Sequence, residues 1–93
     1  MNNNKSTKAI ITVVGRYTAG IIAKVSNVCL EYNVNILDIT QSVIGEYFAM
    51  IMLVNIDNLS CSLEELQRGI KESVPSMTVH VMHEDIFNSM HRI

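Results

Sequence analysis

The chain has 93 residues, of which 48% are hydrophobic, and its 7 basic and 9 acidic side chains give a formal net charge of −2. This length suits one domain with a thin core, whose stability leans on a partner chain. A slightly acidic chain does not attract polyanions, and no apolar stretch approaches the roughly 20 residues of a membrane span, so neither nucleic acid nor membrane is an expected partner.

The first third of the chain begins with a polar segment. Residues 1–7 resemble a disordered leader. Residues 9–14 (AIITVV) are apolar and β-branched, which predicts a buried strand that Gly15 ends. Residues 16–20 then form a loop.

A helix is predicted from Ile21, because apolar residues recur there at helical spacing. Thr18 is the expected N-cap. Asn33 is the expected C-terminal stop, since asparagine tolerates the left-handed conformation. The predicted buried stripe consists of Ile21, Val25, Val28, Cys29 and Tyr32.

Two strands follow, over residues 35–44 and 47–56, joined by a turn at Gly45 and Glu46. This is the pattern of a β-hairpin. Residues 47–56 are apolar without alternation, so we expect both faces of that strand to be covered. Residues 35–44 form an expected sheet edge that can pair with a second chain.

A second helix is predicted by the capping box from Ser62 to Glu65. Pro75 is expected to stop it, and residues 77–82 are predicted to form the last strand. The apolar stripe of this helix consists of Leu63, Leu66, Ile70 and Val74.

The predicted order is strand, helix, strand, strand, helix, strand. It is typical of the α+β ferredoxin-like βαββαβ sandwich, in which two helices cover one face of a four-stranded antiparallel sheet. Residues 84–93 (EDIFNSMHRI) are predicted to add a short helical tail. So short a helix is stable only when docked, so we expect it to pack on the sheet or on a partner chain.

The loop at residues 15–20 joins a strand to a helix N-terminus. Free main-chain N–H groups and the helix dipole favour an anion there, so a carboxylate could bind without a basic side chain. Gly20 would allow a ligand or another main chain to approach closely. The alternative is a plain turn in which Gly20 only relieves packing.

The segment VGRYTAGIIA, followed by NVNILDI, resembles an ACT domain, a regulatory module of amino-acid metabolism. The similarity covers residues 8–83. The whole chain, including its ending HEDIFNSMHRI, resembles a family of stand-alone ACT proteins. The resemblance implies a homodimer that binds a small amino acid at its interface.

The resemblance also implies which residues would form that site. The ligand would contact Gly15, Arg16, Tyr17, Thr18, Ala19 and Gly20 of one chain, and Asn35 and Ile36 of the other. Two positions depart from the family pattern. Tyr17 stands where the family usually has Asp or Asn, and Ala19 stands where it usually has Pro. Tyr17 lacks the short polar side chain that would hold an ammonium group.

The C-terminal histidines allow a second interpretation. His80, His83 and His91 lie near Glu84 and Asp85, and such groups bind first-row metals or act as acids and bases. No nucleophile or oxyanion-hole motif accompanies them, so we expect no enzymatic activity, no metal site and no cofactor.

The two cysteines are Cys29 and Cys61, without a C-x-x-C motif. We expect two reduced thiols in a cytoplasmic protein.

Three functional hypotheses follow. The first is a homodimeric amino-acid sensor, and the second is a protein-interaction module that has lost its ligand. The third is a metal-binding protein or enzyme that uses the C-terminal cluster.

Overall fold

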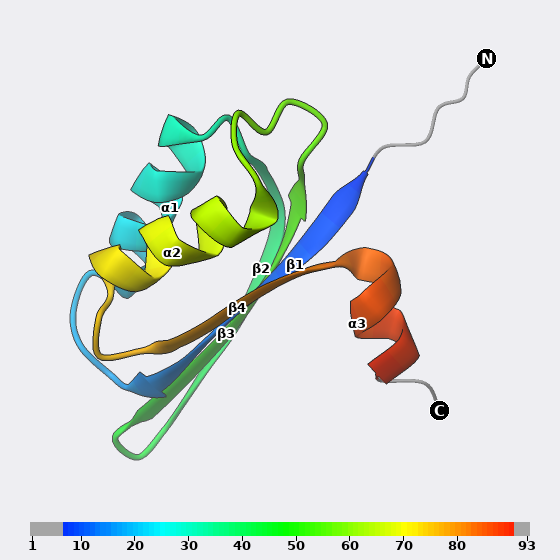
Figure 1. Ribbon diagram of the computed structural model, residues 1–93. Helices are drawn as coiled ribbons and strands as arrows, with labels where there is room; N and C mark the ends of the chain where they lie inside the picture. Colours follow the sequence, from blue (N-terminus) through cyan, green and yellow to red (C-terminus); the bar gives the residue numbers. More distant parts are fainter. Residues whose placement is uncertain (1–6, 91–93) are drawn as a thin grey trace.

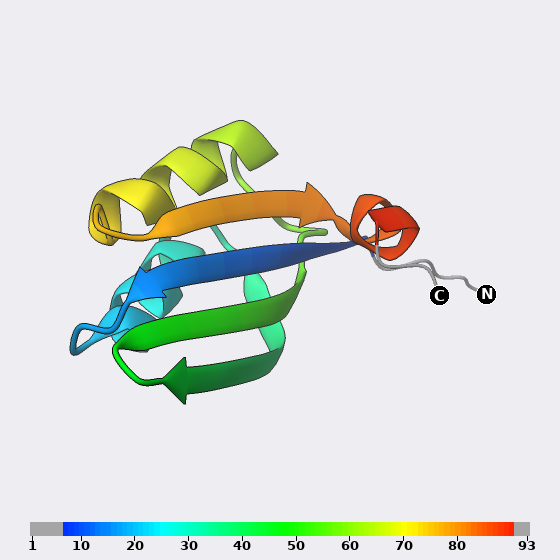
Figure 2. The same ribbon diagram turned by 90° about the horizontal axis from the view of Figure 1, so that it is seen from below.

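The computed structural model describes residues 7–90. The elements follow the order β1 (Lys8–Arg16), α1 (Ile21–Glu31), β2 (Asn35–Ile44), β3 (Tyr47–Asn55), α2 (Leu63–Ser73), β4 (Thr78–His83) and α3 (Glu84–Met90). The strands form one antiparallel sheet in the order β2-β3-β1-β4. Helices α1 and α2 cover one face (Figure 1), and Figure 2 shows the sheet from its other side. The predicted ferredoxin-like βαββαβ fold is confirmed.

The core lies between the sheet and the two covering helices. Along β3, buried side chains alternate with more exposed ones, so only one face of this strand is covered within the chain. The prediction that both faces are covered was wrong for the single chain, because α1 and α2 pack on the same side. The large fully buried side chains include Phe48, Met50 and Met52 of β3, Ile11 and Val13 of β1, Val25 of α1, and Leu66 and Ile70 of α2.

Strand β1 continues past the point at which Gly15 was expected to end it. Gly15 pairs with Phe48, and Arg16 pairs with Tyr47. A Cβ atom on Gly15 would lie 2.7 Å from the sulfur of Met77. The glycine is therefore needed for close packing inside the strand and does not break it.

The start of β1 is held by residue 7, which was expected to belong to the leader. Its N–H donates to Asp57 Oδ1 at 2.8 Å, and its carbonyl accepts from Ile56 N–H at 2.9 Å. The Thr7 N–H is the main cause that holds the pKa of Asp57 below its ordinary value, because it stabilises the carboxylate. The rest of the predicted leader lies outside the described residues.

Helix α1 begins at Ile21, as predicted, but Thr18 does not cap it. Its N-cap is Gly20, with φ of 82°, and no side chain caps the helix there. Glycine adopts this left-handed conformation without the steric cost of a Cβ atom. Asn33 also has a positive φ, of 62°, as expected at the C-terminal stop.

Helix α2 begins with the predicted capping box. The Ser62 side chain accepts from Glu65 N–H at 3.0 Å, and the Glu65 carboxylate accepts from Ser62 N–H at 3.0 Å. The Ser62 N–H is the largest influence that lowers the pKa of Glu65. The helix ends at Ser73, shortly before Pro75.

Replacing Ser62 by Ala is expected to lower the free energy of unfolding by about 1 kcal/mol, because an N-terminal N–H of α2 loses its acceptor. Urea denaturation would measure the loss. Ser60→Ala, in the preceding loop, is the matched control and should change stability by less than about 0.5 kcal/mol. Equal losses in the two variants would contradict the capping role.

Residues 84–90 form the predicted terminal helix, α3. It follows β4 directly, contacts β1 and β4, and buries none of its residues completely. It lies on the side of the sheet opposite α1 and α2 (Figure 1). The last three residues of the predicted tail lie outside the described residues. Within residues 7–90, no helix is long and apolar enough to cross a membrane.

Candidate functional site

A pocket of about 230 Å³ lies at the N-terminus of α1, beside the predicted ligand loop. It lies between the loop, the first turn of α1 and the neighbouring ends of β2 and β3. The residues that line it are Tyr17, Gly20, Ile21, Ile22, Ala23, Gln41 and Phe48. Of the predicted site, Tyr17 and Gly20 therefore contribute to this pocket.

The first turn of α1 gives the pocket hydrogen-bond donors. The first main-chain bond of the helix runs from Lys24 N–H to the Gly20 carbonyl, at 3.0 Å. The N–H groups of Ile21, Ile22 and Ala23 precede that bond and have no intrahelical acceptor. No acidic side chain occupies this turn. The positive end of the helix dipole thus faces the pocket, which favours a carboxylate or another small anion.

Tyr17 forms a wall of the pocket. Its N–H donates to the Glu46 carbonyl at 2.7 Å, which extends the pairing of β1 with β3. Its ring packs on the Phe48 ring, with the centroids 5.9 Å apart and the planes inclined at 53°. This contact orients an apolar ring at the position where a short polar side chain would offer a hydrogen bond. The open part of the pocket therefore lies beside the Tyr17 ring. The hydrogen-bond donors that it offers are the main-chain N–H groups of the first turn of α1.

The remaining loop residues lie outside the lining of the pocket. Arg16 is on the opposite face of the sheet, next to Tyr47, and forms an exposed ion pair of 2.9 Å with Glu46. Gly15 packs against Met77 instead of facing a ligand. Thr18 and Ala19 do not line the hollow.

Asn35 and Ile36 stand at the other end of the sheet. Asn35 is in register with Asn55, which pairs with Lys8, whereas the loop follows Gly15 and Arg16. The seven residue steps from Lys8 to Gly15 correspond to about 23 Å. Within one chain, Asn35 therefore cannot touch a ligand in the α1 pocket. Only an Asn35 from a second chain could do so.

Gln41 and Phe48 are site residues that the sequence reasoning missed. Phe48 belongs to the predicted apolar strand over residues 47–56, and its ring is buried in the core and also forms part of the pocket. Gln41 is a polar residue in register with Met50, on the side of β2 that faces the helices. A polar side chain at a core-facing position of an edge strand was the available signal.

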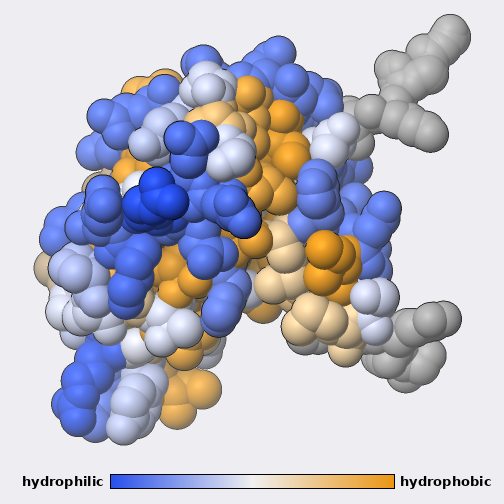
Figure 3. Space-filling view, viewed as in Figure 1, coloured by the Kyte–Doolittle hydropathy of each residue, from blue (hydrophilic) through white to orange (hydrophobic). Residues whose placement is uncertain are grey.

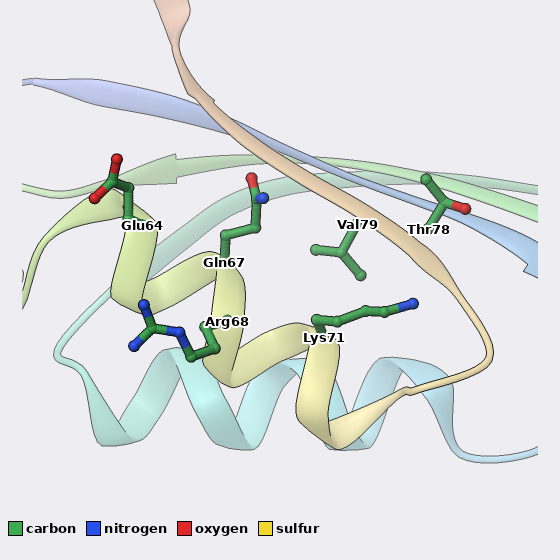
Figure 4. A pocket seen from close by; sticks show the side chains of 6 residues that line it. All are labelled: Glu64, Gln67, Arg68, Lys71, Thr78 and Val79. Atoms are coloured by element: carbon green, nitrogen blue, oxygen red, sulfur yellow. The ribbon is translucent and has the colours of Figure 1, made fainter.

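A second hollow, of about 460 Å³, lies between α2 and the outer edge of β4 (Figure 4). Side chains of α2 that line this hollow form hydrogen bonds with main-chain groups of β4 and of the turn that precedes it. Gln67 Oε1 accepts from Val81 N–H at 2.8 Å, and Lys71 Nζ donates to the Pro75 and Met77 carbonyls. Because α2 supplies these partners, β4 is less available than β2 for pairing with another strand.

The C-terminal histidines do not form a metal cluster with the acidic residues in the described part of the chain. Across residues 7–90, no three His, Cys, Asp or Glu side chains are grouped to hold a metal ion. His80 is on an exposed position of β4, in register with Thr12. His91, the third predicted member, lies outside the described residues.

Both cysteines are free thiols, as expected. Cys29 is buried in α1, and burial raises the pKa of its thiol to about 11. Cys61 is half-buried, and desolvation followed by the Glu65 carboxylate raises its pKa. Neither thiol has the lowered pKa of a nucleophile.

Known proteins of the same size match almost the whole chain. A UPF0237 protein of Clostridium perfringens is 49% identical over 87 residues, which cover 91% of this chain and 98% of the relative. A UPF0237 protein of Methanocaldococcus jannaschii is 40% identical over 89 residues, covering 94% of this chain and 99% of the relative.

Solved structures agree with these relatives. The ACT domain protein from Streptococcus pneumoniae superposes with a TM-score of 0.74 at 34% identity, covering 94% of this chain and 100% of the other. The ACT domain of a GTP pyrophosphokinase from Chlorobium tepidum shares the fold, with a TM-score of 0.65 at 20% identity, covering 84% of this chain and 100% of that domain. The ACT domain family model matches residues 7–84. On this fold and these matches, the chain belongs to the ACT domain family.

Proposed function

We propose that this ACT domain is a regulatory amino-acid sensor that works as a cytoplasmic homodimer. The ligand lies between the α1 pocket of one chain and Asn35 of its partner. The observation that carries the proposal is the position of Gln41, which lines the pocket from the edge strand β2. A second chain along that edge would come close to the pocket.

The main chain of β2 supports pairing with a second copy. The Ile39 N–H donates to the carboxylate of Asp38, its own neighbour, at 2.9 Å, so this main-chain group turns away from β3. By the alternation of an antiparallel ladder, Gln41 and Val43 turn their N–H and C=O groups to the same free edge. Such an edge is a template for another strand.

Antiparallel pairing of β2 with β2 would also complete the site. If two copies pair near Thr40 and Gln41, the partner's strand runs in reverse. Asn35 of the second chain then lies close to the turn at Gly45 and Glu46, at the end of the sheet that carries Tyr17 and Gly20. Its side-chain amide offers both a donor and an acceptor, which suits the ammonium and carboxylate groups of an amino acid.

Calorimetry with glycine, serine and the branched-chain amino acids tests the proposal. Asn35→Ala is expected to weaken binding by about 1–3 kcal/mol, or roughly tenfold to a hundredfold, because polar ligand groups lose a partner. Asn58→Ala, an exposed loop asparagine, is the matched control and should leave affinity unchanged. Equal affinity of wild type and Asn35→Ala would contradict the proposed site.

Tyr17→Asn separates an open site from a closed one. Binding by the wild type supports a sensor in which main-chain donors suffice. Binding only by Tyr17→Asn would show that the Tyr17 ring has closed the pocket in the native protein. Absence of binding by both forms would contradict sensing of these amino acids.

The second candidate function is a protein-interaction module without a ligand. It is favoured by the uncovered face of the sheet, on which Val14, Tyr47 and Ile51 are exposed apolar side chains. Exposed apolar patches of this kind mark interaction surfaces. The calorimetric series distinguishes the two functions, because an interaction module would bind none of the amino acids.

A further inference from the structure

We infer that the hollow between α2 and β4 is a binding site for a short peptide with a free C-terminal carboxylate. The hollow has a volume of about 460 Å³, twice that of the pocket at the start of α1. It lies at the edge of the sheet opposite β2. The inference therefore goes beyond the proposed amino-acid sensor and does not depend on it.

One main-chain unit of β4, that of Val79, is left unpaired beside the hollow. The Val81 N–H donates to Gln67 Oε1, so Val81 turns its main-chain groups away from β1. Residues two apart on a strand turn the same way, and Val79 therefore also presents its N–H and C=O to the free edge. Within residues 7–90, no side chain does for Val79 what Gln67 does for Val81. Val79 is nevertheless only 6% exposed, so a ligand that paired with both groups would be stabilised.

The side chains on either side of Val79 limit the length of chain that can pair with β4. Gln67 occupies the Val81 N–H, and Lys71 Nζ donates to the Met77 carbonyl. A long strand added to this edge would have to displace both contacts. One extended residue opposite Val79 can form both hydrogen bonds of an antiparallel pair and displace neither. The edge thus accepts the end of a peptide in preference to a full strand.

The hollow carries opposite charges at its two ends. Lys71 extends toward Thr78 at one end, and Glu64 stands at the other (Figure 4). Lys71 Nζ has three N–H donors and uses two on the Pro75 and Met77 carbonyls, so one remains for a ligand carboxylate. Arg68 adds a second cation on the wall formed by α2. Glu64 offers an acceptor to an ammonium group.

The spacing of these charges suits a peptide of three residues. Glu64 and Lys71 are seven positions apart on α2, which corresponds to about 10.5 Å along the helix axis. Three extended residues span about 10 Å. A peptide that runs antiparallel to β4 would place its ammonium group near Glu64, its last residue opposite Val79 and its carboxylate beside Lys71.

The surroundings favour recognition of the peptide main chain over its side chains. Hydrophilic side chains gather over α2 in the space-filling view (Figure 3). Of the described residues that line the hollow, only Val79 is apolar. The hollow therefore lacks the apolar walls that would select a large side chain. The two ends of the peptide and its hydrogen bonds to Val79 would determine binding.

Hydrogen exchange measured by NMR, with trialanine added to the whole chain, tests the site. The Val79 amide has no acceptor in the free protein and should exchange at least about tenfold more slowly at saturation, because the peptide accepts from it. The Val81 amide already donates to Gln67 and is the internal control, whose rate should stay the same. Unchanged exchange of Val79 would overturn the inference.

Modified peptides test the two ends of the hollow. Trialanine with a C-terminal amide should bind on the order of tenfold more weakly, because Lys71 and the Val79 N–H lose an anionic acceptor. N-acetylated trialanine should bind roughly twofold to fivefold more weakly to the wild type, since the ion pair with Glu64 is exposed. Glu64→Gln should abolish this difference. Glu72→Gln, which changes an exposed acid of α2 outside the hollow, is the matched control and should keep it.

Equal affinity of the three peptides for the wild type would overturn the inference. Acetate that protects the Val79 amide as strongly as trialanine would also overturn it, because the hollow would then bind anions without recognising a peptide. Trialanine that shifts the amides of residues 21–23 and leaves Val79 unchanged would bind in the α1 pocket, with the same consequence. The calorimetric series on Asn35 and Tyr17 can fail while this test succeeds, so the two proposals are distinguished.

Discussion

Phe48→Ala is expected to lower the free energy of unfolding by about 3–5 kcal/mol, the loss typical of a large core aromatic. Phe48 is among the fully buried side chains of the core, on the inner strand β3 of a sheet that α1 and α2 cover on one side. Removing the ring leaves a cavity that the rigid strand cannot close. Urea denaturation followed by circular dichroism measures the loss.

The same substitution should also alter the pocket at the start of α1, because the Phe48 ring supports Tyr17. Leu30→Ala, which removes an exposed apolar side chain, is the control and should change stability by less than about 0.5 kcal/mol. A loss below about 1 kcal/mol in Phe48→Ala would show that the core rearranges around this position.

Raising the pH from 9 to 11 is expected to remove about 2 kcal/mol of stability through Cys29 alone. Burial raises the pKa of this thiol from 9.0 to about 11. The folded state therefore holds its proton more tightly than the unfolded state. The stabilising contribution is complete below pH 9 and is lost as the pH rises through 11, where the unfolded chain ionises freely.

Urea denaturation at a series of pH values, on wild type and Cys29→Ala, isolates this effect from the titration of Tyr and Lys. Cys29→Ala should be less stable at neutral pH but should lose less stability between pH 9 and 11. Cys61→Ala, at the more exposed thiol, should keep most of the alkaline loss of the wild type. Parallel pH profiles for wild type and Cys29→Ala would exclude Cys29 as the cause.

The predicted helices and strands agree with the structure wherever the pattern of neighbouring residues along the chain determines them. The helical spacing from Ile21 and the capping box at Ser62 locate both covering helices. The errors fall where contacts between distant segments override a local preference. Gly15 breaks a strand by propensity, but pairing with Phe48 keeps it in β1. Thr18 is a good cap by residue type, but the left-handed Gly20 starts the helix.

The candidate site could be predicted only in part. The loop before α1 was recognisable, because a strand followed by a glycine and a helix start places free N–H groups at one point. Gln41 and Phe48 join that loop only through the register of β2 with β3. The same register places Asn35 at the far end of the sheet. A site that included Asn35 would therefore require a second chain.

The sequence by itself determined the order of the elements, the fold class and the family. These follow from hydrophobic periodicity, turn residues and a motif that are all local along the chain. Only the tertiary structure decided which face of β3 is covered, where α3 lies and which edge of the sheet is closed by Gln67 and Lys71. The physical reason is that these features depend on contacts between side chains that are far apart in the sequence. Strand register and helix packing determine which of those side chains come into contact.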